Sequence, residues 1–257
     1  MTKQLSTANL CVGYQDTIIV SDVSVTVPQG KITALIGPNG CGKSTLLKSL
    51  ARILIPVSGQ ILCDNQNIKQ WSAKRFAQTL ALLPQSQLPP EGITVREAVG
   101  YGRSPYTGFW GQLSDKDNQL IEKAMQATGV DSLAEKRVTD LSGGQCQRVW
   151  LAMALAQDTE FVLLDEPTTY LDLNHQVELM KLMQSLRDEN KTVVTVLHDI
   201  NQACRYCDYL IVMKNGQIVC EGTPEQVLTS AMLEDVFSLN AEIHRDPVSK
   251  TPICVVR

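Results

Sequence analysis

The segment that most constrains this chain is a glycine-rich loop between an apolar run and a helical pattern. The apolar run covers residues 32–36, and the helical pattern covers residues 44–53. The loop between them fits the spacing G-x-x-x-x-G-K-[ST], in which converging backbone N–H groups hold phosphate oxygens at the start of a helix. An ordinary glycine-rich turn is the alternative. The strand–loop–helix context favours a nucleoside triphosphate site, formed by Gly37, Pro38, Asn39, Gly40, Cys41, Gly42, Lys43, Ser44 and Thr45.

Two of these residues have side chains suited to the phosphates themselves. Lys43 is placed to reach the β- and γ-phosphates, and the Ser44 hydroxyl is placed to bind Mg²⁺. Cys41 contributes its backbone N–H, and its thiol has no catalytic part.

A pair of carboxylates follows the apolar run at residues 161–164. The carboxyl end of a buried parallel strand is where open α/β sheets place their ligands. Asp165 is suited to hold Mg²⁺ through its water shell, and Glu166 is suited to polarise an attacking water. A pair that merely ends a strand or caps the next helix is the alternative. A carboxylate placed for water favours hydrolysis over transfer of the phosphoryl group to another substrate.

The order of the patterns predicts an α/β fold. Short strand patterns occupy residues 5–14, 17–27 and 32–36, and the runs 161–164 and 193–197 are typical of buried parallel strands on either side of a helix from about Asn174. This order predicts right-handed βαβ units and a mainly parallel core sheet, with an N-terminal antiparallel β portion. We expect a single domain over residues 1–257, with a core subdomain of residues 1–87 and 156–257 and an inserted helical subdomain of residues 88–155.

Two further expectations concern the last part of the chain. Residues 210–220 read as a hairpin, because Asn215-Gly216 favours a tight turn. Residues 223–257 read as a short helical and irregular tail.

Composition narrows the class of protein. The net charge of −4 argues against a nucleic-acid partner, since such proteins are usually basic. No apolar run reaches the ~18–20 residues that cross a bilayer, so attachment to a membrane would depend on partner proteins. The N-terminus lacks the apolar core of a secretory signal, and the eight cysteines are therefore expected to be reduced thiols.

A second anion-binding segment identifies the family that the chain resembles. Ser142 and two glycines are expected to open a helix, whose N-terminus attracts negative charge. An ordinary serine cap with flexible glycines is the alternative. Together with the phosphate loop and the carboxylate pair, the segment resembles the signature of ATP-binding cassette (ABC) ATPases, and implies a P-loop NTPase fold. The signature residues are Leu141, Ser142, Gly143, Gly144 and Gln145.

The resemblance extends over essentially the whole chain and implies four further roles. Tyr14 resembles the aromatic residue that stacks on adenine, and Gln85 resembles the glutamine that senses Mg²⁺ and the attacking water. Asp172 resembles the D-loop residue that couples two sites, and His198 resembles the switch histidine at the γ-phosphate. Taken alone, such a tyrosine is more often packing, and such a histidine is more often structural. One departure from the family pattern is Cys146, where Arg or Lys is common.

The family resemblance also implies partners. In such ATPases the phosphate loop of one subunit faces the signature of the other, with ATP and Mg²⁺ between them. This chain carries one of each, so an isologous homodimer is the simplest assembly. The expected setting is the cytoplasmic face of the inner membrane, beneath two permease subunits that receive substrate from a periplasmic or surface binding protein.

Several short segments resemble the corresponding segments of ATPases from bacterial iron(III)–siderophore importers, and among them ferric dicitrate importers. They include the stretches at residues 34–45, 90–95, 101–106, 164–177 and 246–254. Alternatives are import of another metal chelate such as haem or cobalamin, or a soluble non-transport ABC ATPase. A nucleotide kinase would have no need of the signature segment, and a repair ATPase would carry a long coiled coil that is absent here.

Three smaller features remain. The aromatic loop with Tyr106, Phe109 and Trp110 could receive a permease helix or could pack within its own subdomain, and neither reading is favoured. Cys204 and Cys207 favour packing over a metal site, because no second pair lies nearby. We expect no partner group for the remaining histidines, His175 and His244.

Overall fold

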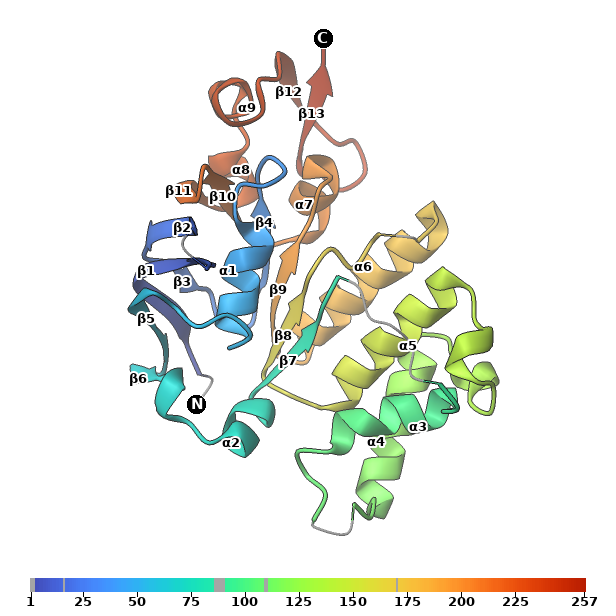
Figure 1. Cartoon of the computed structure of the whole chain (residues 1–257). Coiled ribbons are helices and arrows are strands. Elements are labelled where there is room, and N and C mark those ends of the chain that lie inside the picture. The colour runs from blue at the N-terminus through green and yellow to red at the C-terminus, as the bar shows by residue number, and fades with distance from the viewer. Residues whose placement is uncertain (1–2, 16, 86–90, 109–110, 170) are drawn as a thin grey trace. The chain divides into compact units, whose positions relative to one another are not determined.

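The computed structural model describes residues 3–15, 17–85, 91–108, 111–169 and 171–257. Contacts within the chain divide it into two compact units. The first unit comprises Met1–Trp71 and Met183–Arg257, and the second comprises Ser72–Leu182. Both units contain strands and helices, which Figure 1 labels in chain order.

An antiparallel sheet forms the N-terminal part of the first unit. Strand β1 (Leu5–Tyr14) pairs with β2 (Thr17–Val23), β3 (Thr26–Val27) and β5 (Ser58–Cys63), and β6 (Gln66–Asn67) pairs with β5. The antiparallel portion is therefore present as predicted.

The single strand expected over residues 17–27 is divided into β2 and β3. Asp22 adopts a left-handed φ of 53°, which bends the chain at the end of β2. The Thr7 hydroxyl then donates to Val23 O at 2.9 Å and accepts from Val25 N at 3.1 Å. A side chain thus satisfies the backbone groups that a continuous ladder would have paired.

Parallel strands form the core of the first unit. All five residues of β4 (Ile32–Ile36) are buried, and β4 lies between β9 (Thr192–Val196) and β10 (Tyr209–Lys214), parallel to both. Strand β11 (Gln217–Gly222) returns antiparallel to β10 through a turn at Asn215 and Gly216, with φ values of 50° and 79°. These positive values suit the Asn-Gly pair, and the predicted hairpin is confirmed.

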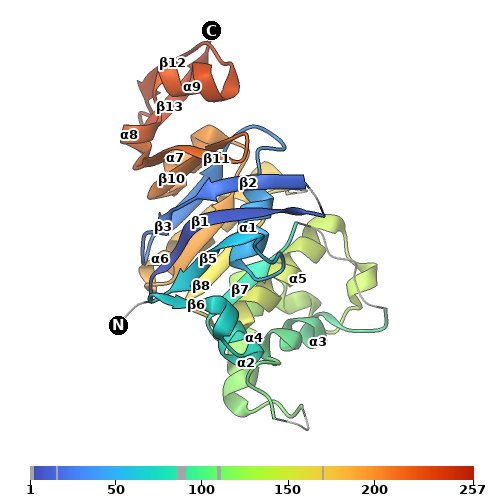
Figure 2. The same ribbon diagram turned by 60° about the vertical axis from the view of Figure 1, so that its left-hand side comes forward.

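Helix α1 (Lys43–Leu50) contacts β1 and β2 on one side and β9 on the other, so it lies between the antiparallel sheet and the parallel strands (Figure 2). Helix α7 (Ile200–Tyr206) packs on β4. The buried leucines of α1, namely Leu46, Leu47 and Leu50, join the core of this unit. The packing of α1 fixes the position where the glycine-rich loop ends and the helix begins.

The second unit pairs two parallel strands with a group of helices. Strand β7 (Leu80–Leu83) runs parallel to β8 (Phe161–Leu164). Helices α3 (Val95–Gly100), α4 (Asp115–Ala127) and α5 (Gly143–Ala156) pack on one another, and each begins with a capping box that satisfies its first N–H groups. A helical stretch in this region agrees with the sequence pattern, whereas the subdomain boundaries at residues 88 and 155 stay a prediction.

The remaining elements complete the chain. They are α2 (Ala73–Ala77), the 3₁₀ helices η1 (Ile68–Gln70), η2 (Tyr101–Arg103), η3 (Asp131–Leu133) and η4 (Val138–Asp140), and the helices α6 (Leu173–Asp188), α8 (Pro224–Val227) and α9 (Ser230–Phe237). Among the described residues, no helix combines the length and apolar character needed to span a bilayer.

The prediction of a helical and irregular C-terminal tail was incomplete. After α9 the chain forms an antiparallel hairpin of β12 (Ala241–Arg245) and β13 (Pro252–Val256). The connection is longer than a two-residue turn, and the Asp246 carboxylate holds it by accepting from the N–H groups of Val248 and Ser249. Without an Asn-Gly or Asp-Gly signal, the sequence gives little indication of such a hairpin.

Candidate nucleotide and hydrolysis site

The glycine-rich loop has a backbone that only glycine accommodates at its two ends. Gly37 has a φ of 150°, and a Cβ there would collide with the carbonyl oxygen of Met213 on β10. Gly42 has a φ of 106°, and its Cβ would approach Val20 Cγ2 to 3.0 Å. The loop is therefore pressed against neighbouring backbone and side chains before it enters α1. Glycine backbone of this kind can present N–H groups to an anion at the start of a helix.

Lys43, the first residue of α1, is buried in the loop, with 5% of its surface exposed. Its Nζ donates to Gly37 O at 2.8 Å and to Pro38 O at 3.0 Å. A buried ammonium requires such acceptors. Phosphate oxygens are stronger acceptors than carbonyls because they carry charge, so an arriving phosphate can replace the loop carbonyls.

The Cys41 thiol lies beside this ammonium, with Lys43 Nζ 4.0 Å from Cys41 Sγ. Burial raises the pKa of Cys41 above its ordinary value, and the Lys43 charge offsets only part of that rise. The thiol is therefore held in its protonated form, which agrees with a structural and not a nucleophilic residue.

Gln85 and Glu166 meet in the second unit. Gln85 follows the end of β7 and Glu166 follows the end of β8, so the parallel pairing places both at the same edge. Gln85 Nε2 donates to Glu166 Oε2 at 2.7 Å. This bond orients the carboxylate and leaves the Gln85 amide oxygen as an acceptor. Two residues that are 81 positions apart in sequence thus form one polar group.

The backbone at the end of β8 is unusual. Asp165 is fully buried, and its N–H donates to Leu83 O at 2.9 Å, which extends the pairing with β7. Glu166 then takes a left-handed φ of 51°. For a residue other than glycine this conformation costs about 1–2 kcal/mol. The turn directs consecutive carboxylates differently, with Asp165 inside and Glu166 half-buried at the surface.

The signature segment opens helix α5 as predicted. Ser142 caps the helix, with its Oγ accepting from Gln145 N at 3.3 Å, while Gln145 Oε1 accepts from Ser142 N at 3.1 Å. Because Oγ accepts in this bond, its hydroxyl hydrogen can still be donated to an anion. Gly143 and Ser142 are exposed, and no atom lies within 4 Å of a Cβ built at Gly143. The segment offers an accessible helix N-terminus.

The other predicted residues lie at the ends of their elements. Tyr14 ends β1 with 45% of its surface exposed, and His198 is exposed between β9 and α7. Both belong to the first unit, as does the glycine-rich loop. Asp172 is exposed and caps α6 in the second unit, where its Oδ1 accepts from His175 N at 3.0 Å.

The expectation that His175 and His244 lack partners was wrong. His175 Nδ1 lies 2.8 Å from Asp172 Oδ1, and His244 Nε2 lies 3.1 Å from Glu242 Oε2. The i,i+3 spacing at the start of a helix is the signal that could have revealed the first pair. The His175 backbone N–H, with help from its ring, lowers the pKa of Asp172. Asp172 is thus held as a carboxylate.

The cysteines agree with the sequence analysis. All eight are free thiols, and no group of three potential metal ligands occurs among the described residues. Cys204 and Cys207 are both buried, and burial raises the pKa of Cys204 to about 12. Their burial favours the packing role. Cys146 is half-buried on α5, whereas Phe109 and Trp110, predicted to pack or to receive a permease helix, lie outside the described residues.

Comparison with known proteins decides the family. The family profile described as "ABC transporter" matches residues 20–169, which include the glycine-rich loop, the signature and the carboxylate pair. The chain belongs to the ABC transporter ATPase family. Membership makes ATP the nucleotide of this cassette. The α/β fold with an antiparallel N-terminal sheet and a helical portion agrees with solved ABC cassettes.

Several relatives match over nearly their whole length. A petrobactin import ATP-binding protein of Bacillus anthracis is 48% identical, with 99% of this chain and 94% of the relative covered. An iron(3+)-hydroxamate import ATP-binding protein of Bacillus subtilis is 47% identical, with 98% and 94% covered. A ferric enterobactin transport ATP-binding protein of Escherichia coli is 44% identical, with 96% and 91% covered.

Two solved structures are informative. A chain from an inward-facing metal-chelate type ABC transporter has a TM-score of 0.84 and 30% identity, covering 100% of this chain and 98% of that chain. A dimeric bacterial ABC transporter cassette has a TM-score of 0.76 and 27% identity, covering 85% and 98%. The fold of this cassette thus occurs both in a metal-chelate type transporter and in a paired cassette.

Proposed function

We propose that this cassette hydrolyses ATP as one of two identical subunits and thereby powers import of an iron(III)–siderophore complex. The hydrogen bond between Gln85 and Glu166 carries the hydrolytic part of the proposal. It holds a carboxylate in a fixed orientation at the carboxyl end of β8, where a water could be polarised.

The residues of the first unit bind the triphosphate in this proposal. The N–H groups of Gly40 and Gly42 and the ammonium of Lys43 receive the β- and γ-phosphates at the start of α1. Lys43 exchanges its bonds to the loop carbonyls for bonds to phosphate oxygens. Tyr14, half-exposed at the end of β1, stacks on the adenine ring. His198 contacts the γ-phosphate.

The residues of the second unit supply hydrolysis and pairing. Glu166 accepts a proton from the attacking water, and Gln85 orients both the carboxylate and that water. Ser142, with its hydroxyl hydrogen available, and the N–H groups of Gly143 and Gly144 bind the γ-phosphate held by the partner subunit. Asp172 couples the paired sites.

Mg²⁺ fits the oxygen donors present in this chain. It favours hydroxyl, carboxylate and amide oxygens, which Ser44, Asp165 and Gln85 provide. Asp165 is completely buried, and a buried carboxylate suits a cation held through water. When bound, the ion neutralises charge that develops on the phosphates. Each of the three residues would contribute an oxygen ligand or orient a bound water.

Glu166→Gln tests the hydrolytic role. The amide keeps the size of the side chain but cannot accept the proton of the attacking water. Turnover should therefore fall by about 10²-fold or more, while ATP binding, measured by fluorescence titration, is retained. Glu178→Gln, an exposed position on α6, is the matched control and should keep full activity. Near-normal hydrolysis by the Glu166 variant would remove that residue from its role.

The proposed cargo comes from the relatives, which are named for import of petrobactin, iron(3+)-hydroxamate and ferric enterobactin at 44–48% identity. Ferric dicitrate remains a prediction within this class. Two permease subunits, a substrate-binding protein and a position at the cytoplasmic face of the inner membrane belong to the same proposal.

Co-purification from membranes identifies the permease, and ATPase assays of the reconstituted assembly test the cargo. Ferric siderophores presented with their binding proteins should stimulate hydrolysis more than haem or cobalamin does. If only haem or cobalamin stimulated hydrolysis, the proposed cargo would be wrong, but the ATPase role would stand. Isolation with a non-membrane partner and no permease would instead favour a non-transport ABC ATPase.

A further inference from the structure

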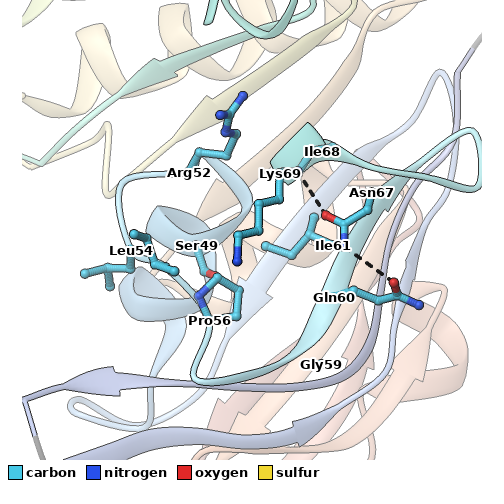
Figure 3. A pocket seen from close by; sticks show the side chains of 11 residues that line it. Ser49, Arg52, Leu54, Pro56, Gly59, Gln60, Ile61, Asn67, Ile68 and Lys69 are labelled. Atoms are coloured by element: carbon cyan, nitrogen blue, oxygen red, sulfur yellow. Dashed lines mark hydrogen bonds between the residues drawn. The ribbon is translucent and has the colours of Figure 1, made fainter. Parts of the chain in front are cut away.

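A pocket in the first unit lies away from the phosphate loop. It occupies about 230 Å³ between the carboxyl end of α1 and the strands β5 and β6, and Figure 3 shows its lining. One water takes about 30 Å³ in the liquid, so the space exceeds what a single water would fill. Its size suits a small organic molecule. The polar lining residues are Ser49, Arg52, Gln60, Asn67 and Lys69.

The charges of this lining have one sign. Arg52 and Lys69 contribute two cations, and neither Asp nor Glu appears among the described residues that line the pocket. The chain as a whole carries a net charge of −4, so the pocket lining is more positive than the chain on average. In Figure 3 the Lys69 side chain extends from η1 in the direction of Ser49, whereas the Arg52 guanidinium points away from both and donates to Trp71 O at 3.1 Å. A local positive field in a concave site favours an anion.

A buried hydroxyl supplies a second, independent observation. The Ser49 side chain is 0% exposed, and its Oγ has no hydrogen-bond partner among the described residues. Buried hydroxyls are normally paired, because leaving one unpaired forfeits the hydrogen bonds it makes with water. A ligand oxygen in the pocket would provide the missing partner.

The backbone conformation at Arg52 is a further observation at this pocket. Arg52 N donates to Ser49 O and Ile53 N donates to Lys48 O, both at 2.9 Å, which is the bonding pattern of a Schellman motif. Arg52 occupies the left-handed position of that motif, with a φ of 58°, where glycine is favoured. An arginine thus occupies a strained backbone position at the edge of this pocket.

Apolar walls complete the site. Ile61 and Ile68 are buried, and Leu54 and Pro56 are half-buried around the same space. We infer that this pocket binds a small organic anion. Its anionic oxygens are held by Lys69 and Ser49, Arg52 adds positive charge at the edge, and its apolar part lies against Ile61 and Ile68. The site is separate from the phosphate loop, but α1 joins them, because Lys43 begins that helix and Ser49 lies near its end.

Phenyl phosphate is a suitable probe, titrated against the full chain with ¹³C-labelled isoleucine methyl groups. Excess Mg–ADP occupies the phosphate loop and prevents competition there. The Ile61 and Ile68 methyl resonances should move saturably, with a Kd of about 1 mM or tighter. Phenol, which lacks the anionic group, should produce smaller shifts at the same concentrations.

Three variants make the test specific. Lys69→Gln should weaken binding about tenfold, as expected for a lost charge-assisted hydrogen bond, and Arg52→Gly, which removes a neighbouring charge, should weaken it about threefold. Arg52→Gly suits the left-handed backbone, so the variant should fold, which far-UV circular dichroism and thermal unfolding would verify. Lys48→Gln is the matched control, since it removes a cation from the last turn of α1 outside the lining, and should bind normally.

Three results would overturn the inference. The first is an absence of saturable shifts at Ile61 and Ile68 up to about 10 mM probe, ten times the expected Kd. The second is equal affinity for phenol and phenyl phosphate, which would make the pocket merely apolar. The third is an equal loss of affinity in the Lys48 and Lys69 variants, which would show that binding depends on the overall charge of the protein and not on a contact with Lys69. None of these results bears on ATP hydrolysis.

Discussion

Single residues decide whether the glycine-rich loop keeps its shape. Gly37 and Gly40 both adopt positive φ values, of 150° and 77°, yet their surroundings differ. A Cβ at Gly37 would meet the Met213 carbonyl, whereas no atom lies within 4 Å of a Cβ at Gly40. The first glycine is required by close packing and the second by backbone conformation alone.

Gly37→Ala should therefore destabilise the protein more than Gly40→Ala does. The clash with backbone forces β10 or the loop to move, and a loss of about 2–4 kcal/mol is expected. The matched Gly40 variant should lose about 1 kcal/mol, the cost of a left-handed alanine. Urea unfolding of both variants measures the difference. Equal losses would show that the Met213 contact does not constrain the loop.

At the scale of elements, Arg103 connects three parts of the second unit. Its Nε donates to Asp117 Oδ1 on α4 at 2.8 Å, and its guanidinium also donates to the carbonyls of Ala156 and Gln157 at the end of α5. Tyr106 lies 3.9 Å beneath the same guanidinium. For Tyr106, these contacts favour packing within the helical region over a role in docking. The carboxyl end of the signature helix is thereby fixed.

Arg103→Met should be strongly destabilising. Arg103 and Asp117 are 3% and 7% exposed, and removal of one partner leaves a buried carboxylate and two uncapped carbonyls. A loss of about 3–5 kcal/mol is expected in chemical unfolding. Arg96→Met is the control, because its bond to Glu122 at 3.0 Å joins two exposed side chains and should contribute below about 1 kcal/mol. Comparable losses would contradict the structural role of Arg103.

The same pair predicts a dependence of stability on pH. The Ser114 hydroxyl and backbone N–H, followed by Arg103, lower the pKa of Asp117 from 3.8 to about 2. Because the folded-state pKa is depressed, the stabilisation is complete above about pH 4 and is lost as the pH falls towards 2. The stability difference between wild type and Asp117→Asn should narrow by at most about 2 kcal/mol over this interval. A constant difference across that range would contradict the lowered pKa.

At the scale of the whole molecule, one chain carries one phosphate loop and one signature. An anion-binding helix N-terminus at Ser142 and a cradle at Lys43 are complementary to the two sides of one triphosphate. In the proposed homodimer, two cassettes related by a two-fold axis would pair each phosphate loop with the signature of the other subunit. In that proposal ATP would link the subunits, and hydrolysis with phosphate release would separate them.

Ser142→Arg should block this pairing. In the Glu166→Gln background, ATP should yield a dimer in sedimentation velocity, and the added Ser142→Arg should leave monomers that still bind ATP within about twofold. The large side chain fills the exposed helix N-terminus, and loss of the serine cap costs only about 1 kcal/mol. Ser104→Arg, another exposed serine of the second unit, is the control and should dimerise. Dimerisation of the Ser142 variant would refute the sandwich arrangement.

Local patterns predicted most elements of this fold from the sequence. The apolar runs at β4 and β8 begin and end where expected, because their residues are buried on all sides and need no alternation. The Asn-Gly turn fixed the β10–β11 hairpin for a similarly local reason. The division of β2 from β3 was not predicted, because it depends on the Thr7 hydroxyl bonding to backbone 16 residues away. The C-terminal hairpin was not predicted, because the connection held by Asp246 has no Asn-Gly or Asp-Gly turn signal.

The sequence by itself determined the family, the phosphate loop and the signature, because fixed spacings of glycine, lysine and serine create local backbone geometry. It also supplied the identities of Gln85, Asp165 and Glu166. Only the tertiary structure decided that Gln85 donates to Glu166 and that Ser49, Arg52 and Lys69 share a pocket. Such groupings depend on how strands and helices pack over long sequence separations, and no local spacing encodes them.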